Sequence, residues 1–460
     1  MGGMSNPYRV QNPVNNQVIE TFDFITDEQL ETVLAAADDA FRQWRTVSYD
    51  DRAALLRKVA SLFDAKRDEL AAIITEEMGK PLNQGQAELD DVVDIFTYYA
   101  DHGAELGADE PLEHEGGRAV LRRVPLGVIV GVMPWNFPYY QVARFAAPAI
   151  MAGNTVLLKH AEICPRSSQA IQDIFDEAGV PAGVFTNIYA THEQISTLIA
   201  DKRVQGVSLT GSERAGRAVA SAAGQNLKKA VLELGGTDAY VVLDADDIEA
   251  AAKTAWKKRI ANTGQACTSN KRIIVMEDIF DDFVAAMVRI AEGFAQGDPT
   301  NPGKGEYYPL SSRDAAEKLV QQVKLAVDAG ATLHTGGELT GEGAYFTPAV
   351  ITGIPVGSDS YYEEFFGPVA EIYKVASDEE AIELANDSNY GLGGAVFSSD
   401  IPRAERVASR IETGMIHVNI PQAGGAELPF GGVKNSGFGR ELGPLGMDEF
   451  VNKQRYYVAE

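Results

Sequence analysis

Apolar residues at helical spacing dominate the first part of the chain. Residues 26–46 and 50–78 both show this period, and they begin with Thr and Asp, residue types that cap helix N-termini. Residues 84–105 predict a third helix. The first third of the protein is therefore predicted to be helical.

Short apolar runs alternate with helical segments from residue 126 to about residue 235. The runs are LGVIVGVM, NTVLLK, VFTNIYA, VQGVSLT and KKAVLEL, and helices are predicted over 138–151, 165–179, 192–200 and 213–223. Short strands separated by helices of this length form a parallel sheet that helices cover on both faces. This region is therefore predicted to be a doubly wound α/β lobe.

A second alternating set occupies the rest of the chain. Its apolar runs are RIIVM, PVAEIYKV, GGAVFSS and GMIHVN, and its helices are predicted over 278–294, 312–328, 377–386 and 402–411. We therefore predict an α/β fold of two doubly wound lobes. Their boundary should lie near residue 235, at the Gly-Gly of LELGGTD.

Residues 116–127, GGRAVLRRVPLG, read as a strand pair with little of its own to pack against. A protruding hairpin leaves unpaired strand edges, and such a hairpin often completes a sheet in another subunit. We therefore expect this hairpin to contact a second copy of the chain.

Composition agrees with this picture and excludes some classes of protein. A chain of 460 residues is too long for one ordinary hydrophobic core, so two large domains and a smaller element are expected. No run approaches ~18 uncharged apolar residues, and the N-terminus lacks a signal-peptide pattern. Two cysteines cannot form a disulfide framework, which indicates a reducing compartment, by default the cytoplasm.

The net charge of −26, from 66 acidic and 40 basic residues, gives a surface that repels nucleic acid and anionic lipid. Neither is an expected partner. Dense carboxylates keep proteins hydrated in a high-salt cytoplasm, and they are also found in ordinary acidic enzymes. The charge alone leaves both interpretations open.

Cys267 lies in NTGQACTSN, a polar and flexible loop that contains glycine and precedes the run RIIVM. A buried structural thiol is the common role of a lone cysteine. A loop at a strand edge between two lobes is, however, where a thiolate can meet a substrate. Cys164 precedes a predicted helix and has no acidic or His partner nearby in sequence, so we interpret it as structural.

A thiolate that attacks a carbonyl needs a base and an oxyanion donor. The six histidines are scattered, and no HExxH, CxxC, GxSxG or Walker A pattern occurs, so neither a metal site nor these nucleophile motifs are expected. Glu233 is the best candidate base because it ends an apolar strand and precedes two glycines. Burial there would raise its pKa, as a water-activating base requires.

Asn136 lies in the aromatic turn GVMPWNFPYYQ, between two prolines. Either the turn is simply packed by Trp135 and Phe137, or it holds the Asn136 amide still as a donor to an oxyanion.

The dinucleotide fingerprint GxGxxG is absent, and SLTGSERAG offers a weaker signal. There a strand leads through Gly211 and Ser212 into a helix, whose free N–H groups can receive a phosphate. Lys159 and Glu162 follow another strand, where they either reach a ribose or form a solvated charged turn.

Six ordered motifs resemble those of the aldehyde dehydrogenase superfamily: MPWNFP, LTGSERAG, LELGG, NTGQACTSN, EEFFGPV and LPFGGVKNSGFGRELG. The resemblance covers nearly the whole chain. It implies that Cys267 attacks the aldehyde carbon, that Asn136 and the Cys267 backbone N–H hold the thiohemiacetal oxyanion, and that Glu233 activates the water that hydrolyses the thioester.

The resemblance also implies a nicotinamide cofactor. The implied cofactor-binding residues are Trp135, Lys159, Glu162, Gly211, Ser212, Glu364 and Phe366. Glu364 is similar to the family glutamate that binds the nicotinamide ribose, and Phe366 packs near the ring. Because Glu162 would crowd a 2′-phosphate, NAD is favoured over NADP, with NADP possible.

The family organisation implies three parts. These are a cofactor domain over 1–111 and 127–235, a catalytic domain over 236–444, and an oligomerisation element over 112–126 and 445–460. Family members assemble through the last of these, so a homodimer or homotetramer is expected.

Within the family, the chain resembles the shorter succinate-semialdehyde dehydrogenases of bacteria and archaea. Arg144 matches an arginine that grips the distal carboxylate of the substrate, although a helix-surface arginine paired with an acid is the simpler interpretation. Phe430 is expected beside the substrate. A second arginine and a serine of the larger enzymes are Ala261 and Gly425 here, and Arg259 is a possible substitute. Other semialdehydes or neutral aldehydes therefore remain alternative substrates.

Two other functions compete on this fold. A CoA-acylating dehydrogenase would lack the glutamate base, and a catalytically silent relative would lack the cysteine or the glutamate. Both Glu233 and Cys267 are present, which favours the hydrolytic enzyme.

Overall fold

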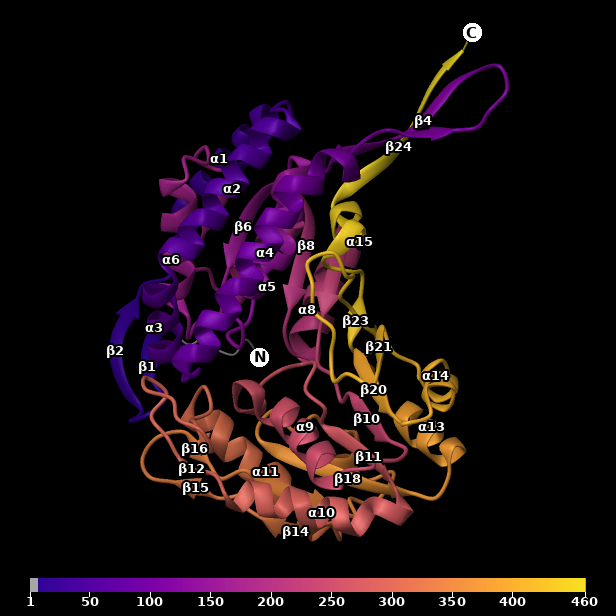
Figure 1. The fold of residues 1–460 in the computed structure, drawn as a ribbon. Coiled ribbons are helices and arrows are strands. Elements are labelled where there is room, and N and C mark those ends of the chain that lie inside the picture. The colour runs from indigo at the N-terminus through magenta and orange to yellow at the C-terminus, as the bar shows by residue number, and fades with distance from the viewer. Residues whose placement is uncertain (1–6, 460) are drawn as a thin grey trace.

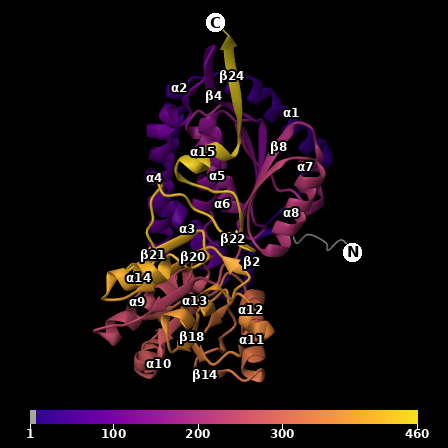
Figure 2. The same cartoon turned by 90° about the vertical axis from the view of Figure 1, so that its right-hand side faces the viewer.

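The computed structural model describes residues 7–459, which form two α/β lobes and a projecting arm (Figures 1 and 2). The sheet of the first lobe has the order β23-β9-β8-β5-β6-β7. Its strands are β5 (Val128–Val132), β6 (Thr155–Lys159), β7 (Phe185–Asn187), β8 (Val204–Thr210), β9 (Lys229–Glu233) and β23 (Gly437–Phe438). They are parallel except for β23, which runs antiparallel to β9. The predicted parallel sheet is confirmed.

Helices connect these strands close to where the hydrophobic pattern predicts them. They are α5 (Tyr140–Ala152), α6 (Pro165–Glu177), α7 (His192–Ala200) and α8 (Glu213–Gln225). Every residue of β6 is buried, as is most of α5, because helices and strands of this lobe pack on both sides of them.

The N-terminal region is less uniformly helical than its pattern predicts. Its helices are α1 (Asp27–Trp44), α2 (Tyr49–Ala65), α3 (Arg67–Met78) and α4 (Leu82–Leu106). The single helix predicted over 50–78 is broken at Lys66, whose φ of −102° and ψ of 15° depart from helical values. The break lets α3 pack on α4 and on an unpredicted hairpin, β1 (Tyr8–Asn12) and β2 (Gln17–Phe22). Tyr8 anchors that hairpin by donating from its hydroxyl to the backbone oxygens of His160 and Ala190.

The second lobe contains a sheet of order β14-β17-β18-β11-β10-β20-β21. Its strands are β10 (Ala239–Val242), β11 (Arg272–Met276), β14 (Thr332–Thr335), β17 (Ala349–Thr352), β18 (Val369–Val375), β20 (Gly393–Phe397) and β21 (Met415–Val418). All neighbouring pairs are parallel except β14 with β17. A second doubly wound lobe is therefore confirmed.

Helices and short strand pairs complete this lobe. The helices are α9 (Ile248–Ile260), α10 (Glu277–Glu292), α11 (Arg313–Asp328), α12 (Asp359–Tyr362), α13 (Asp378–Asn386) and α14 (Ile401–Ala408), with the 3₁₀ turn η1 (Ala261–Gly264). The last helix, α15 (Gly443–Glu449), packs on α5 and α4 of the first lobe. The short pairs are β12 (Ala295–Gln296) with β13 (Glu306–Tyr307), β15 (Leu339–Thr340) with β16 (Tyr345–Phe346), and β19 (Tyr390–Gly391) with β22 (Val433–Lys434).

The arm is an antiparallel sheet of order β24-β4-β3 that projects from the first lobe (Figure 1). It consists of β3 (Glu110–Leu112), β4 (Gly117–Pro125) and β24 (Val451–Ala459). The strand pair predicted within 116–127 is wrong, because these residues form the single strand β4, whose partners are β3 before it and the C-terminal strand β24. Among residues 7–459, no helix is long and apolar enough to cross a bilayer.

The carboxyl edge of the first sheet gathers the residues that the sequence singles out. Asn136 follows β5, Lys159 ends β6, Gly211 follows β8 and Glu233 ends β9. Parallel strands present their carboxyl ends at one edge, which is where α/β folds bind ligands. The C-terminal segment returns to this edge, because Gly437 in β23 pairs with Glu233. The two sheets are therefore not divided at a single point near residue 235.

Candidate active site

Hydrogen bonds anchor the loop that contains Cys267. Asn262, Thr263 and Gly264 take positive φ values of 51°, 54° and 74°, a conformation that is costly for a β-branched threonine. The side-chain amide of Asn262 compensates by donating to the backbone oxygens of Asn136 at 2.9 Å and Gln265 at 3.1 Å. The polar groups of the loop are thus bonded both within the loop and to the turn that contains Asn136.

Cys267 is partly buried and lines a cavity of about 450 Å³. Burial raises the pKa of its thiol to about 11, although Arg144 and Lys271 act in the opposite direction. The thiol is therefore protonated near neutral pH and needs a base before it can attack. The other cysteine, Cys164, is fully buried at the start of α6, as expected for a structural thiol.

Asn136 is buried beside this loop with its amide orientation fixed. Gln141 donates from Nε2 to its Oδ1 at 2.9 Å, and its own Nδ2 donates to the backbone oxygen of Gln265 at 3.0 Å. A primary amide has two N–H donors, so one remains for a further acceptor. Asn136 is thus held as a donor directed at the cysteine loop.

Glu233 is 2% exposed, and among the described residues neither of its carboxylate oxygens has a hydrogen-bond partner. Burial and the neighbouring Glu441 raise its pKa well above the usual value, against the effect of Arg144. Its backbone oxygen accepts from the N–H of Gly211 at 2.9 Å. Glu233 is not among the residues that line the Cys267 cavity, although the charge of Arg144, which does line it, acts on Glu233.

A glycine makes room for this carboxylate. A Cβ on Gly431, whose φ is 153°, would lie 2.7 Å from Oε1 of Glu233. The first glycine of the PFGG motif therefore allows the chain to pass over the buried acid.

Arg144 and Phe430 line the cavity with Cys267. Arg144 is 1% exposed, and its Nε lies 2.6 Å from Oε2 of Glu441, while its guanidinium lies 4.1 Å from the ring centre of Phe430. Pairing with an acid was the simpler interpretation of this arginine, but the pair is buried and not on the surface. Backbone hydrogen bonds between Phe430 and Glu441 hold the acid in place.

Glu441 was missed by sequence reasoning, although it lies in the quoted motif GRELG. Its pairing with Arg144 depends on the return of the C-terminal segment to the first lobe, which the local pattern does not contain.

Arg259 does not substitute for a substrate-binding arginine. It is fully buried and donates to the backbone oxygens of Val369 at 2.6 Å and Phe365 at 2.7 Å, and to Oγ of Ser269 at 2.8 Å. It therefore anchors the cysteine loop to the second lobe. The preceding residue, Lys258, lines the cavity instead, and sequence reasoning missed it.

The charged turn after β6 is tightly paired. Nζ of Lys159 lies 2.5 Å from Oε1 of Glu162, and Nε2 of His192 lies 3.4 Å from the same oxygen. Burial acts to raise the pKa of Glu162, but the hydrogen bond from His192 and the Lys159 ammonium outweigh it and lower the pKa to about 2. The carboxylate is therefore ionised throughout the neutral range.

Glu364 is fixed between the two lobes. Its Oε1 lies 2.9 Å from Nζ of Lys271 and accepts from the N–H of Gly236 at 3.1 Å. Lys271 also donates to the backbone oxygens of Ala266 and Cys267 at 2.8 and 2.9 Å. Glu364 is thereby linked to the cysteine loop. A Cβ on Gly235 would lie 2.5 Å from its Oε2, so the glycine keeps that side clear.

The remaining predicted cofactor residues lie along the same edge. Ser212 caps α8 by accepting from the N–H of Ala215 at 3.3 Å, and Trp135 packs edge-on against Phe366 with ring centres 5.8 Å apart. Carboxylates and an ammonium suit ribose hydroxyls, and a helix N-terminus suits a phosphate. This donor set fits a nicotinamide dinucleotide.

Comparison with known proteins agrees with this geometry. The model of the aldehyde dehydrogenase family matches residues 2–455. A succinate-semialdehyde dehydrogenase [NADP(+)] of Deinococcus radiodurans is 46% identical over 449 residues, which are 97% of this chain and 94% of that protein. A succinate semialdehyde dehydrogenase [NAD(P)+] of Escherichia coli K12 is 40% identical over 444 residues, 96% of each chain.

A solved structure gives the same result. The crystal structure of succinic semialdehyde dehydrogenase from Streptococcus pyogenes in complex with NADP+ superimposes with a TM-score of 0.96 at 46% identity, over 98% of this chain and 100% of that one. The expected preference for NAD over NADP has no support among these relatives. The chain therefore belongs to the aldehyde dehydrogenase family and is an NAD(P)-dependent oxidoreductase.

Proposed function

We propose that this enzyme oxidises succinate semialdehyde to succinate with NADP+ as the electron acceptor. The observation that carries the proposal is the cavity at Cys267, where Lys258 supplies a cation that, within residues 7–459, is not paired with a carboxylate, whereas Arg144 is paired with Glu441 and the facing helix α4 contributes Asp91 and Asp94. Cations beside the nucleophile suit an aldehyde that carries a distal carboxylate. The names of the relatives support the same substrate and cofactor.

The reaction begins with proton removal from Cys267. Because burial keeps the thiol protonated, a base must take its proton as sulfur bonds to the aldehyde carbon. Glu233, as the carboxylate, serves as that base, because burial raises its pKa and thereby strengthens its affinity for the proton. The product is a thiohemiacetal on Cys267.

The oxyanion of the thiohemiacetal is stabilised by the amide of Asn136 and the backbone N–H of Cys267. Gln141 holds the Asn136 amide before substrate arrives, so little reorganisation is needed. The bound nicotinamide supplies a hydride acceptor, and loss of hydride from the substrate carbon leaves a thioester.

Hydrolysis of the thioester returns the enzyme to its starting state. Glu233 first releases to solvent the proton that it took from Cys267. Its carboxylate then takes a proton from water as the water oxygen attacks the thioester carbon, and the C–S bond breaks with return of that proton to the sulfur. Cys267 regains its proton, and the acid is released.

Cofactor binding is assigned to Lys159, Ser212, Glu364 and the aromatic pair Trp135–Phe366. Lys159 supplies positive charge for the 2′-phosphate of NADP+, His192 offers a ring nitrogen beside it, and the Glu162 carboxylate opposes the phosphate. We therefore expect NADP+ to be accepted, with Glu162 limiting its affinity.

The arm supports assembly into a homodimer or homotetramer. Most residues of its C-terminal strand, β24, are exposed, including Tyr456, Tyr457 and Val458. An exposed apolar strand edge is a site for pairing with another chain. Light scattering should therefore report a mass of two or four chains, and a monomer would contradict this assignment.

The test is a kinetic comparison of succinate semialdehyde with butanal, an uncharged aldehyde of the same carbon number. Absorbance of the reduced cofactor is followed with NADP+ and with NAD+, in the absence of CoA. We expect kcat/KM to be at least about 10-fold higher for the semialdehyde. Cys267→Ala should abolish turnover of both aldehydes. Equal kcat/KM values would contradict the substrate, and a CoA requirement would contradict hydrolysis.

A further inference from the structure

Lys258 occupies a distinctive place in the catalytic cavity. It lies near the C-terminal end of α9, three residues before Ala261, so both lie on one face of the chain as it approaches the cysteine loop. Ala261 and Lys258 both line the cavity that contains Cys267. The small side chain of Ala261 leaves space there, and the long side chain one turn earlier reaches into it.

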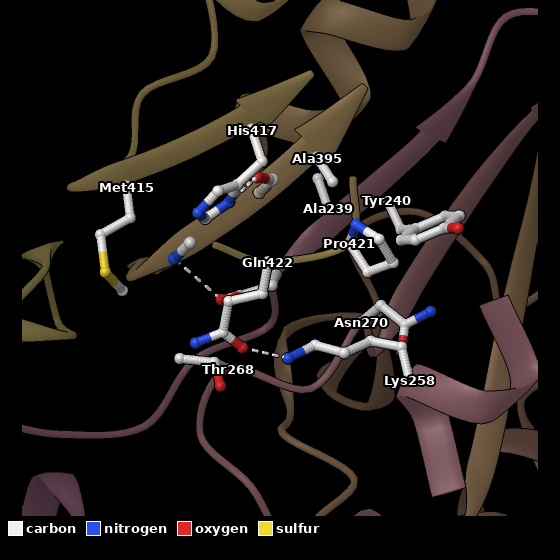
Figure 3. Close-up of a pocket in the computed structure, with 13 residues that line it drawn as sticks. Ala239, Tyr240, Lys258, Thr268, Asn270, Ala395, Met415, His417, Pro421 and Gln422 are labelled. Carbon is white, nitrogen blue, oxygen red and sulfur yellow. Dashed lines mark hydrogen bonds between the residues drawn. The ribbon is translucent and has the colours of Figure 1, made fainter. Parts of the chain in front are cut away.

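The surroundings of Lys258 are polar and include a carboxyl group, that of Asp238, which lines the adjoining pocket. Its Nζ donates to the side-chain oxygen of Gln422, a neutral group, and Figure 3 shows the two side chains directed toward one another beside Thr268. Behind them lies a pocket of about 10 Å³, room for about one water molecule. Burial lowers the pKa of Lys258 to about 8, against the effects of Asp238 and Cys267. The ammonium form therefore still predominates at neutral pH.

The other charges of the cavity are less available to a carboxylate. Arg144 is paired with Glu441, and Asp91 and Asp94 on α4 line the cavity with negative charge. Burial and neighbouring Glu88 raise the pKa of Asp91 to about 6, which still leaves it mostly ionised at pH 7. An anionic group would be repelled from α4 and attracted toward α9.

We propose that Lys258, together with Gln422, binds the distal carboxylate of the aldehyde substrate. The inference rests on the proposed function, because it concerns the same semialdehyde. The substrate carboxylate replaces the neutral amide oxygen as the principal partner of the ammonium, and the Gln422 amide nitrogen can donate to the same carboxylate. The larger enzymes have an arginine where this chain has Ala261. Lys258 would take the role of that arginine from a position one helical turn earlier in the chain.

The test compares Lys258→Met with Lys258→Arg, using succinate semialdehyde and butanal as substrates. Lys257→Met is the matched control, because it removes the same charge from the exposed neighbouring position. Lys258→Met should raise KM for the semialdehyde by about 10- to 100-fold and leave KM for butanal within about twofold. Lys258→Arg should retain most of the semialdehyde preference, and Lys257→Met should behave as wild type.

The outcomes separate this inference from the proposed function. A wild-type enzyme without preference for the semialdehyde contradicts the proposed function itself. A wild-type preference that survives in Lys258→Met, or an equal loss for both aldehydes, overturns the assignment of Lys258. If Lys258→Met does not fold, Lys258→Gln provides the neutral side chain and is judged by the same two KM values.

Discussion

Two cation–carboxylate pairs lie at the carboxyl edge of the first-lobe sheet, and they differ in their surroundings. Arg144 and Glu441, at the catalytic end, lie 2.6 Å apart with side chains 1% and 3% exposed. Lys159 and Glu162, at the cofactor end, lie 2.5 Å apart; the Lys159 side chain is 4% exposed, and only the Glu162 side chain, at 23%, reaches solvent.

Their carboxyl groups respond in opposite directions. Burial raises the pKa of Glu441 in spite of Arg144, whereas the cations around Glu162 lower its pKa to about 2 in spite of burial. Ionised Glu162 therefore contributes stability above its unfolded pKa, and that contribution is lost as pH falls through about 2. For Glu441, with its raised pKa, ionisation disfavours folding as pH rises above the unfolded value.

The difference in burial determines how each pair responds to the loss of a partner or the arrival of a ligand. A buried pair is costly to break, because the remaining charge is left without solvent. A partly exposed pair can rearrange when a ligand arrives, because water and the ligand can replace either partner. The catalytic end is thus preorganised, and the cofactor end is adjustable.

The largest effect is expected from the free carboxyl beside the buried pair, Glu233. In Glu233→Gln the amide cannot accept the proton of water, so hydrolysis of the thioester should slow by at least about 100-fold. Rapid mixing with aldehyde and NADP+ should show a burst of at most one reduced cofactor per active site.

Added hydroxylamine provides the control, because it attacks the thioester without needing the base. It should restore turnover in Glu233→Gln. Steady wild-type turnover in the variant without hydroxylamine would exclude Glu233 as the hydrolytic base.

The buried pair itself should make a large contribution to the integrity of the fold. Arg144→Met leaves Glu441 without its cation, and we expect a loss of about 3–5 kcal/mol in the free energy of unfolding of the first lobe. Urea denaturation followed by fluorescence measures this change. Adding Glu441→Gln in the same chain should recover at least half of it.

Arg42→Met is the matched control for this experiment. Arg42 pairs with Asp38 on the surface of α1, with its side chain 70% exposed, so its removal should cost less than about 1 kcal/mol. Equal free energies of unfolding for Arg144→Met and Arg42→Met would contradict the expectation that the buried pair is the more costly one to break.

Much of the fold could be predicted from the sequence, because its helices and strands have clear periodicities. The helix over 192–200 and the strand RIIVM have the predicted bounds. The break at Lys66 could not be predicted, since the apolar period continues through 50–78. It arises from packing of α3 against α4 and the N-terminal hairpin, which are tertiary contacts.

The candidate site was partly predictable for a similar reason. The motifs identify Cys267, Asn136 and Glu233, and the structure brings these residues to neighbouring positions. The pairing of Arg144 with Glu441 depends on segments that are distant along the chain. The orientation of Lys258 toward the cavity and of Arg259 away from it depends on how α9 docks, and the residue types alone do not determine that.

The smallest effect is expected at the adjustable pair. Glu162→Gln removes the negative charge that opposes a 2′-phosphate and leaves Lys159 and His192 free to bind it. The ratio of kcat/KM for NADP+ to that for NAD+ should therefore rise by about 10-fold, mainly through a lower KM for NADP+. Stability should fall, because Lys159 is buried and loses its carboxylate partner, so the kinetic ratio is measured at a temperature below the onset of unfolding. Glu193→Gln, an exposed residue beside His192, removes one negative charge without touching the pair and should leave the ratio unchanged. An unchanged ratio in Glu162→Gln would show that the 2′-phosphate binds away from Glu162. The difference between the Lys159–Glu162 and Arg144–Glu441 pairs would then have no consequence for cofactor choice.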